Sequence, residues 1–211
     1  MATHGASAGS DLTVVTSYLS PDGPSVMEAR GSLVVSSLQH LRDAKLYDAY
    51  VQQITPQKHE QLGEVLASSW VPVSLLLEHC MAIDGIGLSE SHLQGHGEKI
   101  AALISESSFS IMMRTARGMG LDKALWWLLG QVDRLWPRLY RGGGCTVLRA
   151  GPKDAILEVH GQPLFTSRFF RTAHHAFVAG LVRSFADTSY VKPVRPREAH
   201  PHRAATAMSW V

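Results

Sequence analysis

The chain has 211 residues, of which 45% are hydrophobic and 18% are charged, and its formal net charge is +2 at pH 7. This length and composition predict one soluble domain with a sizeable core, and the small net charge gives no reason to expect a nucleic-acid partner. The two cysteines, Cys80 and Cys145, lie too far apart for a zinc motif or a disulfide framework, so a cytoplasmic location is expected. No apolar run is long enough to span a membrane.

The N-terminal segment differs in composition from the rest of the chain. Residues 1–28 are rich in serine, glycine, alanine, threonine and proline, which predicts a flexible tail with one short extended piece at 12–19. A single α+β domain is expected to follow at residues 29–211.

Helical patterns dominate the first half of this domain. Thr55 and Pro56 predict the start of one helix, because threonine caps a helix N-terminus and proline is tolerated at the first helical position. A second helix is expected within 72–85, and the apolar spacing predicts a third over 98–117. The stretch HLQGHG (92–97) places two histidines four residues apart, but its two glycines favour a loop.

The clearest helix comes next, and its apolar stripe has helical periodicity: Leu125, Leu129, Val132, Trp136 and Leu139. Asp122 is expected to cap the start of this helix. Pro137 is expected to kink it by removing one backbone hydrogen bond, and the glycines at 142–144 are expected to end it.

After these glycines the apolar pattern changes from helical to alternating. Two strands are predicted at 145–150 and 154–160, then a helix over 167–186, then two more strands at 189–195 and 204–211. The expected fold class is therefore α+β. An N-terminal helical part is followed by a β-β-α-β-β unit, whose four-stranded antiparallel sheet packs against helices.

No catalytic motif is found in the sequence. There is no nucleophile elbow, phosphate loop or dinucleotide fingerprint, and neither cysteine has a histidine placed to act as its base. His200 and His202, together with His160, would form at most an adventitious metal site, because no acidic partner is fixed by the spacing. No catalytic residue and no metal site are therefore predicted.

Aromatic residues of the clearest helix raise the prospect of a ligand pocket. Trp136 belongs to the apolar stripe, and Tyr140 follows four residues later. Trp126 and Trp127 are adjacent, so they cannot both point inward. These four side chains are either ordinary core residues or the lining of a pocket between helices and sheet.

Two adjacent histidines on the later helix were weighed in the same way. His174 and His175 point in different directions along a helix, so they cannot chelate one ion together. His174 lies beside Phe177 on the apolar face and is either a core histidine or a pocket residue. The hypothetical ligand pocket therefore comprises Trp126, Trp127, Trp136, Tyr140, His174 and Phe177.

Four stretches carry a resemblance to a known superfamily. They are GSLVVSSLQHLRD (31–43), ASSWVPVSLLLEHCMAID (67–84), LWPRLYRGGG (135–144) and TAMSW (206–210). With the order of elements, they resemble an uncharacterised bacterial group, best known from myxobacteria, that is related to the haem–nitric oxide/oxygen-binding (H-NOX) and four-vinyl-reductase-type domains. The resemblance implies an α+β sensor domain that holds a ligand between its helical part and its sheet.

The chain departs from these relatives at their chemical sites. Trp136 stands where an H-NOX domain has the histidine that ligates haem iron, and an indole N–H has no lone pair for a metal. The stretch LEVHGQPL (157–164) has neither the tyrosine nor the arginine that would bind the haem carboxylates. Residues 196–210 lack the cysteines of four-vinyl-reductase-type domains. No cofactor, and in particular no haem, is therefore expected.

Two functions remain as hypotheses. The first is a non-enzymatic sensor or regulatory module that binds a small apolar or amphipathic ligand and signals through an unknown protein partner. The alternative is a ligand-free interaction or scaffold protein, acting as a homodimer, whose ancestral pocket is filled by Trp136. An enzyme is a third class, with no nucleophile–base pair in its favour. The cavity beside Trp136, open or packed solid, discriminates between the first two.

Overall fold

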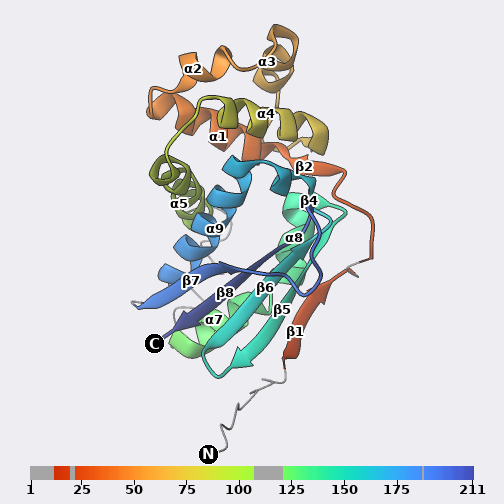
Figure 1. The fold of residues 1–211 in the computed structure, drawn as a ribbon, viewed down its shortest axis with the longest axis vertical. Helices are drawn as coiled ribbons and strands as arrows, with labels where there is room; N and C mark the ends of the chain where they lie inside the picture. Colours follow the sequence, from red (N-terminus) through yellow and green to blue (C-terminus); the bar gives the residue numbers. More distant parts are fainter. Residues whose placement is uncertain (1–11, 20–21, 107–120, 187) are drawn as a thin grey trace, which may run out of the picture.

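The computed structural model describes residues 12–19, 22–106, 121–186 and 188–211. A five-stranded antiparallel sheet forms one half of the molecule (Figure 1). In order across the sheet, its strands are β1 (Thr13–Tyr18), β5 (Gly144–Gly151), β6 (Asp154–His160), β8 (Ala204–Trp210) and β7 (Ser189–Val194). The α+β class and the four predicted strands are confirmed.

Strand β1 is a fifth strand, formed by the short extended piece predicted at 12–19. It pairs antiparallel with β5 along its length. Further along, the Val26 backbone N–H donates to the carbonyl of Gly161 at 2.7 Å, which fastens the following segment to the domain. Strand β1 and Val26 are thus hydrogen-bonded to residues of the domain predicted at 29–211. Residues 1–11 of the predicted tail lie outside the described part of the chain.

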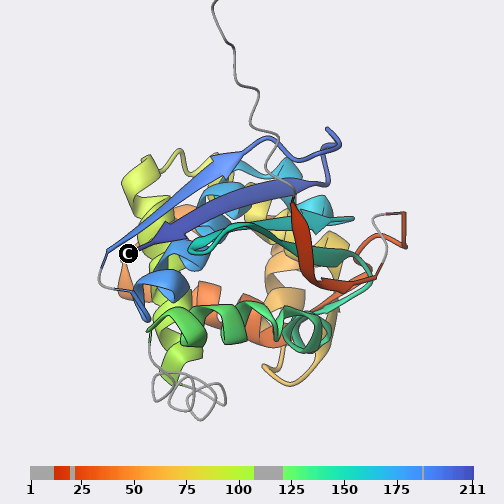
Figure 2. The same ribbon diagram turned by 90° about the horizontal axis from the view of Figure 1, so that it is seen from below.

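Alternation along β5 and β6 turns their apolar side chains toward one face of the sheet. Cys145 lies opposite Val159, and Val147 lies opposite Leu157, so each pair shares a face. Figure 2 shows that the helices gather on one face of the sheet. In β8, the residues predicted to alternate inward are all buried: Thr206, Met208 and Trp210.

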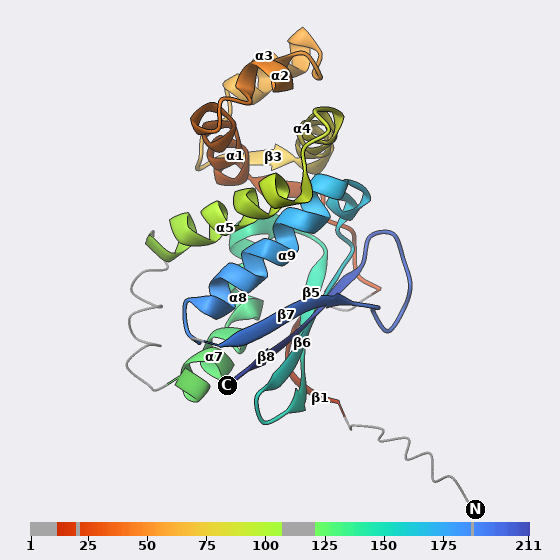
Figure 3. The same cartoon turned by 60° about the vertical axis from the view of Figure 1, so that its left-hand side comes forward.

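The helices of the N-terminal part are α1 (Gly31–Asp43), α2 (Tyr47–Val51), α3 (Pro56–Gly63), α4 (Val73–Gly85) and α5 (Glu90–Glu106). Thr55 caps α3 as predicted, because its hydroxyl oxygen accepts a hydrogen bond from the N–H of Lys58. Figure 3 shows α1 to α4 at one end of the molecule, beyond the sheet. Within the described ranges, no helix combines the length and the apolar character needed to cross a bilayer.

Helix α5 contains the stretch 92–97, so the loop predicted there is wrong. The reason is the packing of α5 along α9 (Arg168–Arg183), seen side by side in Figure 3. Gly97 lies so close to α9 that a Cβ at this position would overlap the carbonyl of Ala173. The glycine thus permits a close helix–helix contact instead of ending the helix. The helix predicted over 98–117 is confirmed to the end of α5, and its remainder lies outside the described residues.

The helix predicted around the apolar stripe is two helices, α7 (Leu121–Leu129) and α8 (Val132–Leu139). The chain breaks at Gly130, whose N–H bonds the carbonyl of Trp126, and not at Pro137, which lies inside α8. Helix α8 ends before the predicted glycines, because Tyr140 already has extended backbone angles (φ −138°, ψ 148°).

A second, three-stranded sheet joins the two halves of the molecule. Its order is β3 (Trp70–Pro72), β2 (Glu28–Arg30) and β4 (Tyr140–Arg141). Strands of two or three residues are too short to show an alternation, so the sequence does not predict them. Trp70 lies between two guanidinium groups, with Arg30 at 4.1 Å and Arg141 at 4.3 Å from its ring. These contacts attach the end of α8 to the helical part.

Candidate functional site

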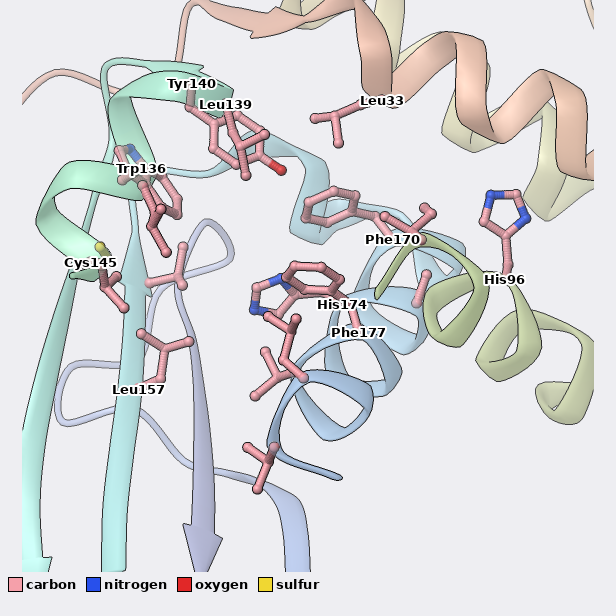
Figure 4. A pocket seen from close by; sticks show the side chains of 18 of the residues that line it. Leu33, His96, Trp136, Leu139, Tyr140, Cys145, Leu157, Phe170, His174 and Phe177 are labelled. Atoms are coloured by element: carbon pink, nitrogen blue, oxygen red, sulfur yellow. The ribbon is translucent and has the colours of Figure 1, made fainter. Parts of the chain in front are cut away.

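A cavity lies between the helices and the sheet (Figure 4). Its volume is about 200 Å3, and its walls come from α1, α4, α5, α7, α8 and α9 and from strands β4, β5, β6 and β8. An engineered apolar cavity of about 150 Å3 is enough to hold benzene. The cavity in this protein is therefore large enough for a small organic ligand.

Apolar side chains form most of the wall. Helices α7 and α8 contribute a continuous row of Leu125, Leu128, Leu129, Val132, Leu135 and Leu139. Opposite them, Leu157 of β6 and Phe170 and Phe177 of α9 point into the same space (Figure 4). Among the described lining residues there is no Lys, Arg, Asp or Glu. The cavity thus presents no formal charge to a ligand.

Trp136 and Tyr140 form one side of the cavity. Their ring centroids are 4.7 Å apart, and the Trp136 indole N–H donates to the carbonyl of Gly142 at 3.0 Å. This bond fixes the indole, and the indole supports the Tyr140 ring. Figure 4 shows the Tyr140 hydroxyl directed into the cavity, and within the described chain it has no hydrogen-bond partner. Burial, with a smaller contribution from Cys80, raises the pKa of Tyr140, so the hydroxyl stays protonated.

His174 reaches the cavity from α9, whereas His175 does not. The His174 ring packs against Phe165 at 5.2 Å and Phe170 at 6.0 Å, and no described group hydrogen-bonds to its nitrogens. Burial, followed by the neighbouring His175, lowers the pKa of His174 to about 3, so the imidazole is neutral. His175 instead bonds the hydroxyl of Thr206 at 2.9 Å. The predicted divergence of the two histidines is confirmed.

His79 is a lining residue that the sequence analysis did not include. Its Nδ1 lies 2.8 Å from the hydroxyl of Tyr50 and its Nε2 lies 2.8 Å from the hydroxyl of Ser37. Burial lowers the pKa of His79 to about 4. Both ring nitrogens are satisfied within the fold, so this histidine ties α1, α2 and α4 together. No local pattern points to it, because its partners lie 29 and 42 residues away.

His96 was also missed, because its helix was predicted as a loop. It lies between α1 and α9, with its ring 4.4 Å from that of His40 and 4.8 Å from that of Phe169. Burial, followed by His40 and then His79, lowers the pKa of His96 to about 3. Its Nε2 is buried and has no partner in the described chain. The four-residue spacing from His92 was the available signal, since it places both on a helix.

The two cysteines are free, buried and in the wall of the cavity. Burial, followed by Asp84, raises the pKa of the Cys80 thiol. Burial, followed by Asp133, raises the pKa of the Cys145 thiol to about 12. Both groups are therefore thiols rather than thiolates at neutral pH, and neither is an activated nucleophile.

Of the six predicted pocket residues, the structure brings four to the cavity: Trp136, Tyr140, His174 and Phe177. Trp126 and Trp127 do not line it and pack instead against a second core cluster beneath the sheet. The Trp126 indole N–H donates to the carbonyl of Pro152 at 2.8 Å, and its ring lies 5.1 Å from that of Trp210. The part of α7 that lines the cavity is Leu125, Leu128 and Leu129, so Trp126 and Trp127 lie on other faces of this helix.

The histidines near the last strand form no chelating group. The N–H of His202 donates to Nδ1 of His200 at 3.1 Å, so the ring is used within its own loop. His160 is buried, and its Nε2 lies against Gly144. Within the ranges that the structure describes, no three His, Cys, Asp or Glu residues are placed to hold one metal ion.

No family model matches the chain, and no curated protein matches it in sequence. Solved structures do match its fold. A structure of an Fe(II) unliganded H-NOX protein from K. algicida has a TM-score of 0.60 and 13% identity, covering 86% of this chain and 96% of that one. A structure from work on the function of heme distortion in the H-NOX family has a TM-score of 0.56 and 12% identity, covering 86% and 94%. The chain therefore has the H-NOX fold.

Proposed function

We propose that the chain is a non-enzymatic ligand-binding domain of the sensor or regulatory kind, which takes up a small, largely apolar molecule between its helices and its sheet. The observation that supports this most is the apolar cavity of about 200 Å3 beside Trp136. A cavity of this size costs stability, because the lining atoms lose packing contacts. A core with a purely structural role would be more stable if side chains filled this space.

The position of Trp136 argues against the scaffold alternative. That alternative needs the indole to fill the ancestral pocket. The indole lies instead in the wall, hydrogen-bonded to Gly142 and packed against the tilted ring of Tyr140, and the space beside it stays open.

Haem does not fit the residues of this cavity. By the sequence resemblance Trp136 takes the place of the iron-ligating histidine, and its N–H is engaged with a carbonyl and has no lone pair. The described part of the lining offers no Lys or Arg to the two haem carboxylates. A porphyrin ring is also several times larger than benzene, which already needs about 150 Å3. We therefore propose a ligand other than haem.

Signalling would proceed through the small sheet. Tyr140 begins β4, β4 pairs with β2, and β2 pairs with β3, which leads into α4. A ligand that favours one position of Tyr140 would therefore shift the helical end relative to the large sheet. In this proposal the change is read by a protein partner at the helical end.

The test uses ethylbenzene as the probe, with Leu157→Trp as a variant that fills the cavity and Leu157→Met as its volume-matched control. Ethylbenzene should raise the Tm of the wild type and of Leu157→Met, since a ligand that binds only the folded state stabilises it. It should not raise the Tm of Leu157→Trp. A wild type whose Tm is unchanged at saturating ethylbenzene, or a purified protein with a haem absorption band, would overturn the proposal.

A further inference from the structure

We propose that the cavity selects an uncharged, mainly apolar ligand with one hydrogen-bonding group, which is bound by the Tyr140 hydroxyl and the His174 imidazole. This inference rests on the proposed ligand-binding function and adds the chemical class of the ligand. It follows from three features of the cavity: its lack of charge, its two unpartnered polar groups and its size.

The lack of charge sets the first limit. No described lining residue is Lys, Arg, Asp or Glu, and burial favours the neutral forms of the histidines, the thiols and Tyr140 at the wall. A carboxylate or an ammonium group would lose its hydration without gaining a counter-charge, at a cost that grows steeply in a low-dielectric site. The ligand is therefore expected to enter as a neutral molecule.

The Tyr140 hydroxyl supplies the first polar contact. A buried hydroxyl without a partner is costly, whereas a hydrogen bond to a ligand removes that cost. Its ring packs against Trp136, and its hydroxyl is directed into the cavity (Figure 4). A protonated phenol oxygen can both donate and accept. It therefore suits an alcohol, a carbonyl or an amide.

His174 supplies the second contact, and a comparison with the other buried histidines singles it out. His79 is satisfied by Tyr50 and Ser37, and His175 is bonded to Thr206. His96 has an unpartnered Nε2, but that atom is enclosed by protein atoms. Among the residues that the structure describes, His174 has no such bond, and its ring faces the open space (Figure 4). One nitrogen of a neutral imidazole donates and the other accepts.

The size of the cavity sets the scale of the ligand. If about 150 Å3 accommodates the six carbons of benzene, then about 200 Å3 corresponds to roughly eight non-hydrogen atoms. Two of the aromatic side chains, Phe170 and Phe177, are placed to pack against a ring. A one-ring molecule with a short polar substituent meets all three limits.

The test compares three probes of equal size that differ in one atom: ethylbenzene, benzyl alcohol and benzylammonium. Affinities are measured by calorimetry on the full chain. Wild type should bind the first two, and it should bind benzylammonium more than about tenfold more weakly than benzyl alcohol.

The variants Tyr140→Phe and His174→Leu test the two contacts. Each variant should bind benzyl alcohol about fivefold more weakly than the wild type does, the effect of one neutral hydrogen bond. The affinity for ethylbenzene should be unchanged. Tyr47→Phe is the matched control, because the Tyr47 hydroxyl bonds His59 and lies outside the cavity. The control should change neither affinity.

The outcomes separate the inference from the function beneath it. If both neutral probes bind and neither variant changes their ratio, the polar contacts are wrong and the apolar cavity stands. Tight binding of benzylammonium overturns the neutral-ligand limit alone. If the folded wild type binds neither ethylbenzene nor benzyl alcohol, the proposed function and this inference fall together.

Discussion

Gly97 of α5 packs against the carbonyl of Ala173 of α9, with no room for a side chain between the two helices. Gly180 of α9 makes a similar approach to Ala101 of α5. Two helices that approach this closely hold His96 and Phe169 at the edge of the cavity. The cavity wall therefore depends on the missing side chain at position 97.

Replacing Gly97 with alanine should destabilise the fold, because the methyl group must push α5 away from α9. Overpacking of this kind costs about 1–3 kcal/mol. Gly95→Ala is the matched control, since a Cβ there meets nothing within 4 Å. The control should stabilise α5 by about 0.5–1 kcal/mol, the ordinary helix preference of alanine over glycine. Chemical denaturation of both variants measures the difference. Equal changes in unfolding free energy for Gly97→Ala and Gly95→Ala would contradict the close contact between α5 and α9 at Gly97.

Trp136 should report the ligand by its fluorescence, because it alone of the predicted tryptophans lines the cavity. Trp136→Phe should remove most of the emission change that ethylbenzene produces. Trp126→Phe is a close control, since that indole also donates to a backbone carbonyl but packs on Trp210. It should leave the change intact. If the emission change is lost in Trp126→Phe instead, Trp126 lines the ligand site, contrary to the structure.

Asp84 should be important for stability, because it joins the end of α4 to the start of α9. Its carboxylate accepts hydrogen bonds from the hydroxyl of Ser167 at 2.8 Å, the N–H of Arg168 at 2.9 Å and the N–H of Phe169 at 2.6 Å. Bonds to a charged group at a helix N-terminus stabilise by about 1.5–3 kcal/mol.

Asp84→Ala should therefore lower the free energy of unfolding by about 2 kcal/mol or more. Asp43→Ala, where the carboxylate has an exposed bond to Gln39, should cost less than about 0.5 kcal/mol. Urea unfolding of the two variants tests the contrast, and a similar small effect in both would show that the link is unimportant.

Stability should fall as the pH is lowered, because several histidines are buried in neutral form. Burial, followed by His175, lowers the pKa of His174 from 6.5 to about 3. Below pH 6.5 the unfolded chain takes up a proton at this residue and the folded chain does not, so the unfolded state is favoured. The contribution of His174 to the free energy of unfolding is fully present above pH 6.5 and is lost progressively as the pH falls toward 3. The same sign applies to His79 and His96.

The measurement is the slope of unfolding free energy against pH. His174→Leu should reduce this slope by about 1.4 kcal/mol per pH unit, the value for one proton. In an NMR titration, the imidazole carbon chemical shifts of His174 should still be those of the neutral ring at pH 5. A titration above that pH would show that the ring is solvated rather than buried.

The strands could be predicted from sequence because alternation is a local signal. The strand expected at 154–160 is β6 to the residue, and Pro56 begins α3 where its chemistry suggests. The polar residues of the site were harder. Tyr140 and His174 were found from their place beside apolar stripes, but His79 depends on Ser37 and Tyr50, which only the folded chain brings near it.

The errors also have physical causes. Gly97 carries the same sequence signal whether it breaks a helix or admits a neighbouring one, and the neighbour lies more than seventy residues away. A helix with an apolar stripe gives no sign that Gly130 divides it, because the stripe continues on α8. Trp126 and Trp127 lie outside the cavity because Leu125, Leu128 and Leu129 form the face of α7 that lines it.

The pairing of β1 with β5 has a practical consequence for any shortened form of the protein. A fragment that starts at residue 29 would lack Thr13–Tyr18 and leave the outer edge of β5 without its partner. Unpaired backbone groups on a long edge strand recruit other strands, so such a fragment would tend to self-associate. Aggregation of such a fragment would then reflect the missing strand and not a property of the full chain.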